Sequence, residues 1–190
     1  RVFLRDGTSL DLPLAEMLLV QNDGWVLAYS NGFLHVVSHD GVHYTYKWDR
    51  PIPATDPMNK HYLVAGRNGD GEIVVVEMIH PGATLYMYRS SGEELVKVQT
   101  LDLSTQVGNI KALWNDGPRL YIRGVMRDKV DTETGRWTPR YAARIDIAAG
   151  EMSVKWLAPI MTSNGGPTLY PRSTDVVAVS GPFFARLDSE

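Results

Sequence analysis

Gly32-Phe-Leu-His-Val-Val-Ser-His-Asp-Gly41, followed by Val42-His-Tyr-Thr-Tyr-Lys-Trp48, decides the fold, because it has the form of two short strands joined by a glycine turn. The same form returns at residues 84–98 around Gly92 and at residues 141–156 around Gly150. The turn glycines are spaced 92 − 41 = 51 and 150 − 92 = 58 residues apart. One hairpin cannot bury its apolar face alone, so the repeat predicts blades or sheets stacked around a common axis.

Short segments of alternating apolar and polar residues continue along the whole chain, separated by Asn-Gly, Asp-Gly and Ser-Gly turns. They predict thirteen strands, at residues 25–30, 33–37, 43–48, 62–65, 73–79, 85–88, 95–101, 110–114, 119–125, 141–147, 154–157, 176–179 and 183–187. This density of short strands indicates an all-β fold, a small or partial β-propeller of about four antiparallel blades, with a β-sandwich as the alternative. We expect residues 1–190 to form a single domain of this kind.

The two ends of the chain carry complementary halves of the repeat. Residues 1–12 resemble a second half, residues 168–188 resemble a first half, and Ala185-Arg-Leu-Asp188 echoes Ala143-Arg-Ile-Asp146. We therefore expect one blade built from both termini, which would remove free sheet edges. Trp48, Val98 and Trp156 are expected at equivalent positions, with the two tryptophans packed between blades. Because the chain begins at Arg1, we expect a processed form or a piece of a longer protein.

Composition excludes several classes of function. The net charge is −3 with mixed signs, which gives no electrostatic reason to expect a nucleic-acid partner. The apolar runs are much shorter than the ~20 residues of a membrane-spanning helix, so no membrane insertion is expected. The absence of cysteine removes disulfides, thiolate metal sites and thiol nucleophiles. No phosphate-binding glycine loop, nucleophile elbow or zinc-protease motif is present, and no cofactor is expected.

The stretch Ser38-His-Asp-Gly-Val-His-Tyr44 resembles the Asp-box of sialidase-like propellers and the similar turn of five-bladed glycoside hydrolases. In this chain Gly41 follows Asp40 directly, and a tyrosine stands where those families have tryptophan. The resemblance covers about one blade. It implies a structural turn in which the aspartate caps backbone amides and the aromatic ring packs between strands. It also implies glycans as ligands, and it carries over no catalytic residue.

Two carboxylates are candidates for catalysis if the protein is a glycoside hydrolase, which needs two such groups at a separation of roughly 5 to 10 Å. Glu77 interrupts an apolar strand and would serve as a general acid if that strand lines a funnel. A paired or edge position is the alternative, because burying an unpaired carboxylate is costly. Asp56 lies in the rigid connector Pro51-Ile-Pro-Ala-Thr-Asp-Pro57, where an ordinary turn is the alternative.

Metal sites have weaker support. His39 and His43 lie four residues apart across a turn and would need a third ligand, either His35 or Asp40, while the alternation favours a packing role for His35. Two segments, residues 68–72 and 131–135, have alternating oxygen ligands suited to calcium, but an ordinary hairpin turn explains the first. We therefore expect no metal site.

The polar insertion at residues 128–140 is the predicted contact surface, because the second repeat manages with a shorter connection. Trp137 stands at its centre between Arg136 and Arg140, and Asp131 and Glu133 supply hydrogen-bond acceptors. A loop tryptophan folded back onto its sheet is the alternative. Arg123, Arg127 and Arg172 are either anion contacts or solvated strand ends.

These observations favour a binding or interaction module that contacts a glycan or a protein partner through its loops. A glycoside hydrolase of a propeller family is the enzyme alternative, and a structural piece of a larger assembly is the third. A funnel with two or three converging carboxylates would favour the enzyme, whereas a plugged channel would favour the module.

Overall fold

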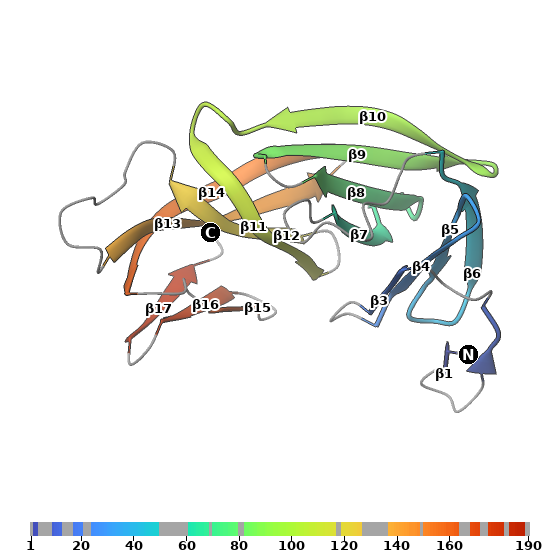
Figure 1. The fold of residues 1–190 in the computed structure, drawn as a ribbon, viewed down its shortest axis with the longest axis horizontal. Coiled ribbons are helices and arrows are strands. Elements are labelled where there is room, and N and C mark those ends of the chain that lie inside the picture. The colour runs from blue at the N-terminus through green and yellow to red at the C-terminus, as the bar shows by residue number, and fades with distance from the viewer. Residues whose placement is uncertain are drawn as a thin grey trace.

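A computed structural model of the chain describes residues 2–3, 9–12, 17–20, 24–49, 61–68, 70–79, 82–116, 119–126, 137–148, 150–163, 168–171, 175–180 and 183–188. These residues form an all-β fold of antiparallel sheets, as the sequence predicts (Figure 1). Within the part of the chain described, no helix is long and apolar enough to span a membrane. The strands follow one another in chain order within each sheet, which is the meander pattern of propeller blades.

Three sheets have four strands each, and we call them blades 1 to 3. Blade 1 comprises β3 (Met17–Val20), β4 (Val26–Ser30), β5 (Phe33–Val37) and β6 (His43–Lys47). Blade 2 comprises β7 (His61–Arg67), β8 (Ile73–Ile79), β9 (Thr84–Ser91) and β10 (Glu94–Asp102). Blade 3 comprises β11 (Val107–Asp116), β12 (Arg119–Met126), β13 (Trp137–Ala148) and β14 (Glu151–Ser163).

The terminal segments form two smaller sheets. β1 (Val2–Phe3) pairs with β2 (Ser9–Leu10), and β15 (Thr168–Pro171), β16 (Asp175–Ser180) and β17 (Phe183–Asp188) form a three-stranded sheet. The predicted blade shared by both termini is therefore wrong for the described residues. β1 forms its strand pairing with β2 and not with the C-terminal strands. β15, β16 and β17 pair only with one another in the described residues.

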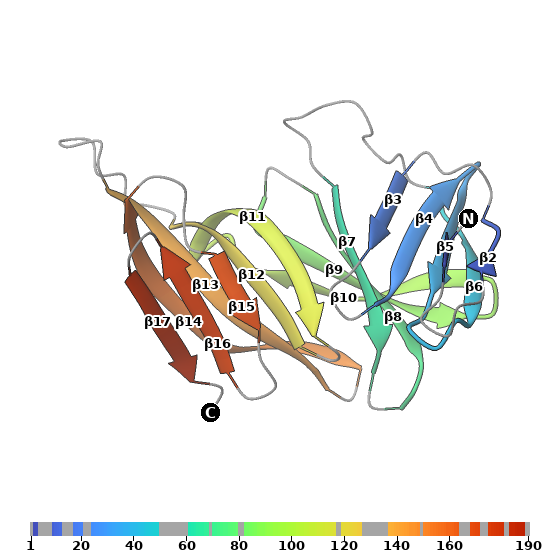
Figure 2. The same ribbon diagram turned by 90° about the horizontal axis from the view of Figure 1, so that it is seen from below.

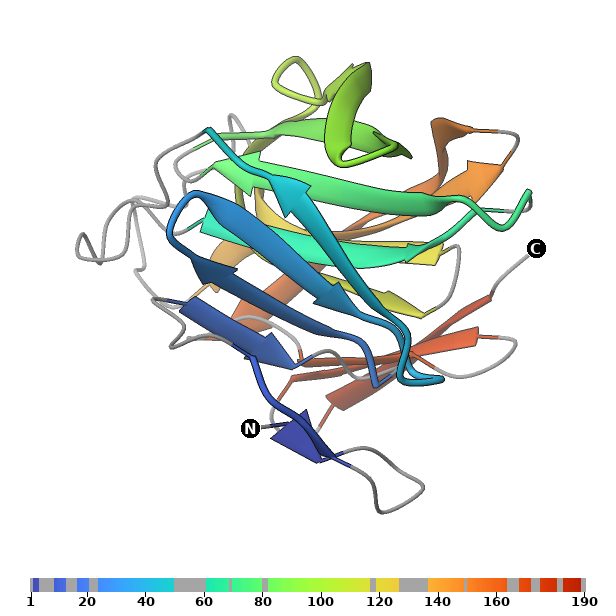
Figure 3. The same ribbon diagram turned by 90° about the vertical axis from the view of Figure 1, so that its right-hand side faces the viewer.

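The sheets lie side by side in chain order, from blade 1 near the N-terminus to β15–β17 near the C-terminus (Figure 2). Blade 1 lies in front of blade 2 when the molecule is seen from its N-terminal side (Figure 3). Blade 2 is thus covered on both faces, which explains why Ile73–Met78 on β8 is buried at every position.

The repeated glycine turn occupies the same place in each blade, between the third and fourth strands. Gly41, Gly92 and Gly150 all have positive φ, at 83°, 61° and 76°, a backbone conformation that favours glycine. The sequence repeat is therefore a repeat of one hairpin per blade.

The expected equivalence of Trp48, Val98 and Trp156 holds only coarsely, because each lies in or directly after the fourth strand of its blade while Trp48 and Val98 differ in burial. Trp48 directly follows β6 and is buried against blade 2, as predicted. Val98 sits at a bulge of β10, where the pairing jumps from Lys97 to Gln99, and it is 44% exposed. A bulge inserts one unpaired residue and redirects its side chain, which explains the difference. The backbone of Trp156 lies in β14 opposite Arg144.

Candidate functional site

Glu77 is fully buried between blades 1 and 2. It lies on β8 opposite Leu63 of β7 and Tyr86 of β9, on the face of blade 2 that meets blade 1. Its exposed fraction is 0%, and the hydroxyl of Tyr88 on β9 donates a hydrogen bond of 2.7 Å to Oε2. A carboxylate in such a place needs a donor, because burial without one is costly. The pair joins two neighbouring strands inside the aromatic core of this interface.

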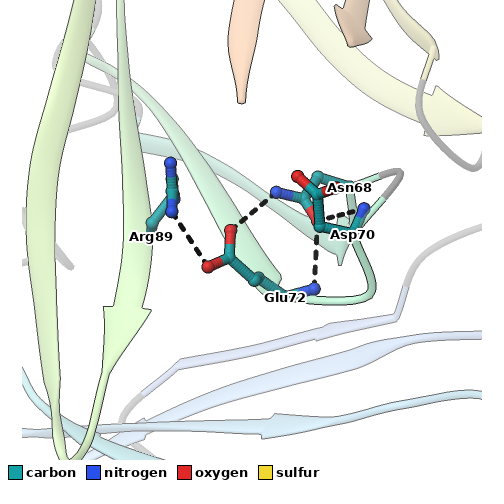
Figure 4. Close-up of polar contacts among 4 residues, drawn as sticks. All are labelled: Asn68, Asp70, Glu72 and Arg89. Atoms are coloured by element: carbon teal, nitrogen blue, oxygen red, sulfur yellow. Dashed lines mark hydrogen bonds and ion pairs between the residues drawn. The ribbon is translucent and has the colours of Figure 1, made fainter. Parts of the chain in front are cut away.

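The β7–β8 turn is held by its own side chains and by an arginine from β9 (Figure 4). Oδ1 of Asn68 accepts hydrogen bonds from the backbone amides of Asp70 and Glu72, both at 3.0 Å. Nδ2 of Asn68 donates to Oε2 of Glu72 at 2.8 Å, and Arg89 donates to Oε1 at 2.9 Å. These bonds, the one from Asn68 first, hold the pKa of Glu72 below its ordinary value.

The hydrogen bonds of this turn use side-chain oxygens that the sequence suggested as calcium ligands in residues 68–72. Both carboxylate oxygens of Glu72 accept hydrogen bonds from positive or amide donors, and the Asn68 oxygen accepts two amides. The side-chain oxygens that Asn68 and Glu72 would offer a calcium ion are therefore engaged inside the turn. Gly71 at φ 81° completes the reversal, as an ordinary hairpin turn requires.

Arg67, at the end of β7, forms hydrogen bonds that link the β7–β8 turn of blade 2 to strand β6 of blade 1. It donates to the backbone oxygen of Gly71 at 2.9 Å and to the hydroxyl of Tyr44 on β6 at 2.7 Å. Its guanidinium also lies 5.6 Å from the ring centre of Tyr44 and 6.0 Å from that of Trp25. The turn ends of the two blades are therefore tied by one cation that bonds to both.

The Asp-box-like turn has the structural form that the resemblance implies. The Ser38 hydroxyl donates to Asp40, and the amide of Gly41 donates to the backbone oxygen of Ser38 at 2.9 Å. The bond from Ser38, together with backbone amides of the turn and Arg67, lowers the pKa of the Asp40 carboxyl. Tyr44 packs against the core between blades 1 and 2.

Two histidines meet on the other face of blade 1. Nδ1 of His35 on β5 lies 3.1 Å from Nε2 of His43 on β6. The hydroxyl oxygen of Thr45 lies 3.3 Å from the first nitrogen and 3.4 Å from the second. Burial lowers the pKa of both imidazoles, and for His43 the nearby His35 lowers it further. His39 is exposed in the adjoining turn and does not join this pair.

Several residues proposed from sequence lie outside the described part of the chain. These are Asp56, Asp131, Glu133 and Arg136, and also Arg127 and Arg172. Trp137 and Arg140 have described backbones, and they differ from the expected loop because β13 begins at Trp137. Trp137 pairs with Ser163 and Arg140 with Ile160, so the connection between β12 and β13 spans only residues 127–136. Arg123 is half-buried on β12 opposite Ala142.

The residues that the sequence did not single out are Tyr88, Arg67 and Arg89. Tyr88 and Arg89 lie in the repeated hairpin, where the pattern indicated only strand residues. Tyr88 could have been expected from the sequence pattern around Glu77, because a carboxylate inside an apolar strand requires a hydrogen-bond donor from a neighbouring strand. Among the described residues there is no group of three or more histidine, cysteine, aspartate or glutamate side chains that could hold a metal ion.

No protein-family model and no curated protein matches the chain. Among solved structures, the chain is similar to the crystal structure of a candidate 6-phosphogluconolactonase from Bacteroides fragilis, with a TM-score of 0.47 and 13% sequence identity. The match covers 90% of this chain and 49% of that one, so the chain spans about half the length of that protein.

Proposed function

We propose that the chain is a protein-binding module built from propeller-like blades, and that it contacts its partner through loops and outer strands. The observation that carries this proposal is the position of Glu77, which is 0% exposed and hydrogen-bonded to Tyr88. A glycosidase acid must reach the glycosidic oxygen of a bound sugar, and a second carboxylate must flank the same bond. A carboxylate sealed between two blades and bonded to a tyrosine of its own blade is better suited to a structural role.

The distribution of aromatic side chains favours a protein partner over a glycan. Trp25, Tyr46, Trp48 and Tyr88 are buried in the core between blades 1 and 2. The large apolar side chains that are exposed in the described part of the chain are mostly aliphatic: Phe33, Val42, Ile79, Val96, Val98 and Val154. Sugar stacking uses the open face of a tryptophan or tyrosine, and neither residue type is among these exposed side chains.

We place the contact surface at the insertion of residues 128–140, with Trp137, Arg136, Arg140, Asp131 and Glu133 as its binding residues. Support comes from the length of the β12–β13 connection, since the β8–β9 connection, between the same two strands of blade 2, needs only residues 80–83. Aromatic and arginine side chains are enriched among the residues that dominate binding energy at protein interfaces. The outer strands β10 and β14 also expose Val96, Val98 and Val154, but toward the Gly150 hairpin and away from Trp137, so they would form a second contact patch.

A glycosidase assay separates the module from the enzyme. Purified protein is incubated with a panel of aryl α- and β-glycosides, alongside Glu77→Gln and Tyr88→Phe variants that pass a folding check by circular dichroism. We expect no hydrolysis above the buffer rate for any of the three proteins. Hydrolysis by the wild type that falls at least ~100-fold in folded Glu77→Gln, as expected for loss of a general acid, would overturn the proposal.

A photo-crosslinking experiment locates the contact surface. A photoreactive amino acid is placed at position 133 in one variant and at position 70, in the exposed β7–β8 turn, in a matched control. We expect one specific protein to be crosslinked from position 133 and not from position 70. Trp137→Ala should then weaken binding of that purified protein by about 2 kcal/mol, roughly thirtyfold, with little change in melting temperature. A large fall in melting temperature with unchanged binding would place the contact elsewhere.

A further inference from the structure

The face of blade 1 that is turned away from blade 2 brings two imidazoles together. The strand register pairs His35 with Thr45 and Val37 with His43, so these histidines are diagonal neighbours on adjacent strands. Leu34 and Val36 point to the opposite face and pack against blade 2. His35 is buried, His43 is half-buried and Thr45 is exposed, so the group opens to solvent from the Thr45 side.

Three donor atoms form a nearly equilateral triangle at this place. The nitrogen-to-nitrogen edge is 3.1 Å, and the two edges to the Thr45 oxygen are 3.3 and 3.4 Å. A zinc ion bound about 2.0–2.1 Å from each of two nitrogens, with an angle of about 100° between the bonds, separates them by this distance. The Thr45 oxygen occupies the place of a third ligand on the same side. The triangle thus has the dimensions of one face of a coordination sphere.

We propose that His35 Nδ1, His43 Nε2 and the Thr45 hydroxyl oxygen bind a divalent transition-metal ion, of the Zn²⁺, Ni²⁺ or Cu²⁺ type. Imidazole nitrogens select these ions over Mg²⁺ and Ca²⁺, which prefer carboxylate and carbonyl oxygens. Thr45 is exposed, so a further coordination position on its side can take water. The site lies on a different face of blade 1 from the tie between Arg67 and Tyr44 and is independent of the protein-binding proposal.

The protonation states fit this assignment. Without a metal, the 3.1 Å contact requires one of the facing nitrogens to carry a proton and the other to accept it. A metal needs a lone pair on both, so in a pair of neutral rings the shared proton moves to the outer nitrogen of the ring that carried it, Nε2 of His35 or Nδ1 of His43, and each ring keeps one proton.

Titration calorimetry with chloride salts of Zn²⁺, Ni²⁺ and Mg²⁺ tests the proposal on protein freed of metal by a chelator. We expect one Zn²⁺ or Ni²⁺ per chain and no binding of Mg²⁺. His43→Asn, a change on a half-buried position, should lower the affinity at least ~tenfold, and Thr45→Ala should lower it less. His39→Asn is the matched control and should leave the affinity within about twofold. Equal loss in the His39 and His43 variants, or no binding by wild type, would overturn the proposal.

A second measurement does not depend on the folding of any variant. Nitrogen-15 spectra of the wild-type imidazole rings distinguish Nδ1 from Nε2 ligation. Adding Zn²⁺ should shift Nδ1 of His35 and Nε2 of His43 and leave both nitrogens of His39 unchanged. Shifts confined to His39, or to the opposite nitrogens of the pair, would show that the histidine pair is held by its hydrogen bond alone and that the site does not exist.

Discussion

The two faces of blade 2 are packed by different chemistry. Against blade 1, the core cluster contains four aromatic residues, Trp25, Tyr46, Trp48 and Tyr88, and the rings of Trp48 and Tyr88 meet edge to face at 5.9 Å. Against blade 3, the cluster of described residues is aliphatic except for Tyr141. The first face contains two polar ties, one within blade 2 from Tyr88 to Glu77 and one between the blades from Arg67 to Tyr44. The second is filled by valine, leucine, isoleucine and methionine.

The difference shows two ways of fixing the position of neighbouring blades. Hydrogen bonds have directional requirements, so the bond from Arg67 to Tyr44 restricts how blade 1 can sit on blade 2. Blades 2 and 3 are tied at their outer strands, where Gln99 of β10 donates to and accepts from the backbone of Met152 on β14, while the aliphatic core between them relies on volume and close approach of the backbone. We therefore expect the blade 3 face to be sensitive to added volume and the blade 1 face to be sensitive to loss of a polar partner.

Gly124→Ala, on the blade 3 face, is expected to cause the largest loss in the free energy of unfolding. A Cβ at this position would overlap the backbone oxygen of Asn109 and lie 2.8 Å from the ring of Tyr141. The backbone atom cannot move aside without disturbing β11, so we expect a loss of about 3 kcal/mol or more in the free energy of unfolding. Urea denaturation followed by fluorescence measures it.

Gly32→Ala is the matched control for Gly124→Ala. Gly32 has φ 81° but nothing within 4 Å of an added Cβ, so alanine there meets only backbone strain. We expect it to cost about 1 kcal/mol. Equal costs at the two positions would mean that the close approach between β11 and β12 does not limit the blade 3 face.

The next effect is that of Tyr88→Phe on the blade 1 face. The substitution keeps the ring against Trp48 but removes the donor to Glu77, which is fully buried. Losing a hydrogen bond to a buried carboxylate should cost about 2 kcal/mol of the free energy of unfolding. The measurement is the same denaturation curve, with Tyr86→Phe, a half-buried tyrosine on the same strand, as the control.

A double-mutant cycle with Glu77→Gln sharpens the result for Tyr88→Phe. The glutamine oxygen still accepts a bond from Tyr88, so the coupling between the two positions should persist at reduced strength. A cycle in which the two substitutions add independently would contradict the assignment of the Glu77–Tyr88 bond as the main polar tie inside this face.

The strands were predictable from sequence to a large extent. All thirteen predicted segments coincide with strands, and residues 33–37 and 73–79 match β5 and β8 at both ends. The alternation carries this information locally. The four strands that were not predicted, β1, β2, β3 and β15, are two to four residues long. The pairing partner of such short segments depends on distant residues, which explains the incorrect prediction of a blade shared by both ends.

The polar contacts were much less predictable. The sequence indicated that Glu77 needs a partner but not that the partner is Tyr88, eleven residues further on and across a hairpin. Likewise Arg67 reaches Tyr44 on the neighbouring blade, over 23 residues of sequence. Strand alternation gives the face of a side chain, whereas these contacts depend on how blades pack, which alternation does not encode.

Asn68→Ala should have a smaller effect, because it acts at the turn end of blade 2 and not inside either face. Asn68 is buried, and its loss removes the acceptor for two backbone amides, for which we expect a cost of about 1.5 kcal/mol. Asn68→Asp keeps the acceptor but replaces the donor to Glu72 by a second carboxylate, so its cost in the free energy of unfolding should be larger at neutral pH than at a pH where one of the two is protonated.

The same turn gives a pH dependence with a defined sign. The pKa of Glu72 is lowered in the folded protein, chiefly by the bond from Asn68, so its contribution to stability is present above its ordinary pKa of 4.5 and is lost as the pH falls through the folded value. Asn68→Ala should flatten the fall in melting temperature below about pH 4.5. An unchanged acid limb in that variant would assign the acid sensitivity to other carboxylates.

The smallest expected change in the free energy of unfolding is a stabilisation, and it comes from Tyr141→Phe on the blade 3 face. The Tyr141 hydroxyl is buried and has no hydrogen-bond partner among the described residues, and burial raises its pKa. The ring covers Gly124, its partner across β12 and β13, and fills the space that a side chain there would take. Tyr141→Phe keeps this packing and removes an unpaired polar atom, so we expect stability to stay equal or to rise by up to about 1 kcal/mol. Tyr141→Ala, in contrast, should cost about 3 kcal/mol through the cavity it leaves. If Tyr141→Phe costs as much as Tyr88→Phe, the blade 3 face also depends on a polar tie, and the contrast between the two faces of blade 2 does not hold.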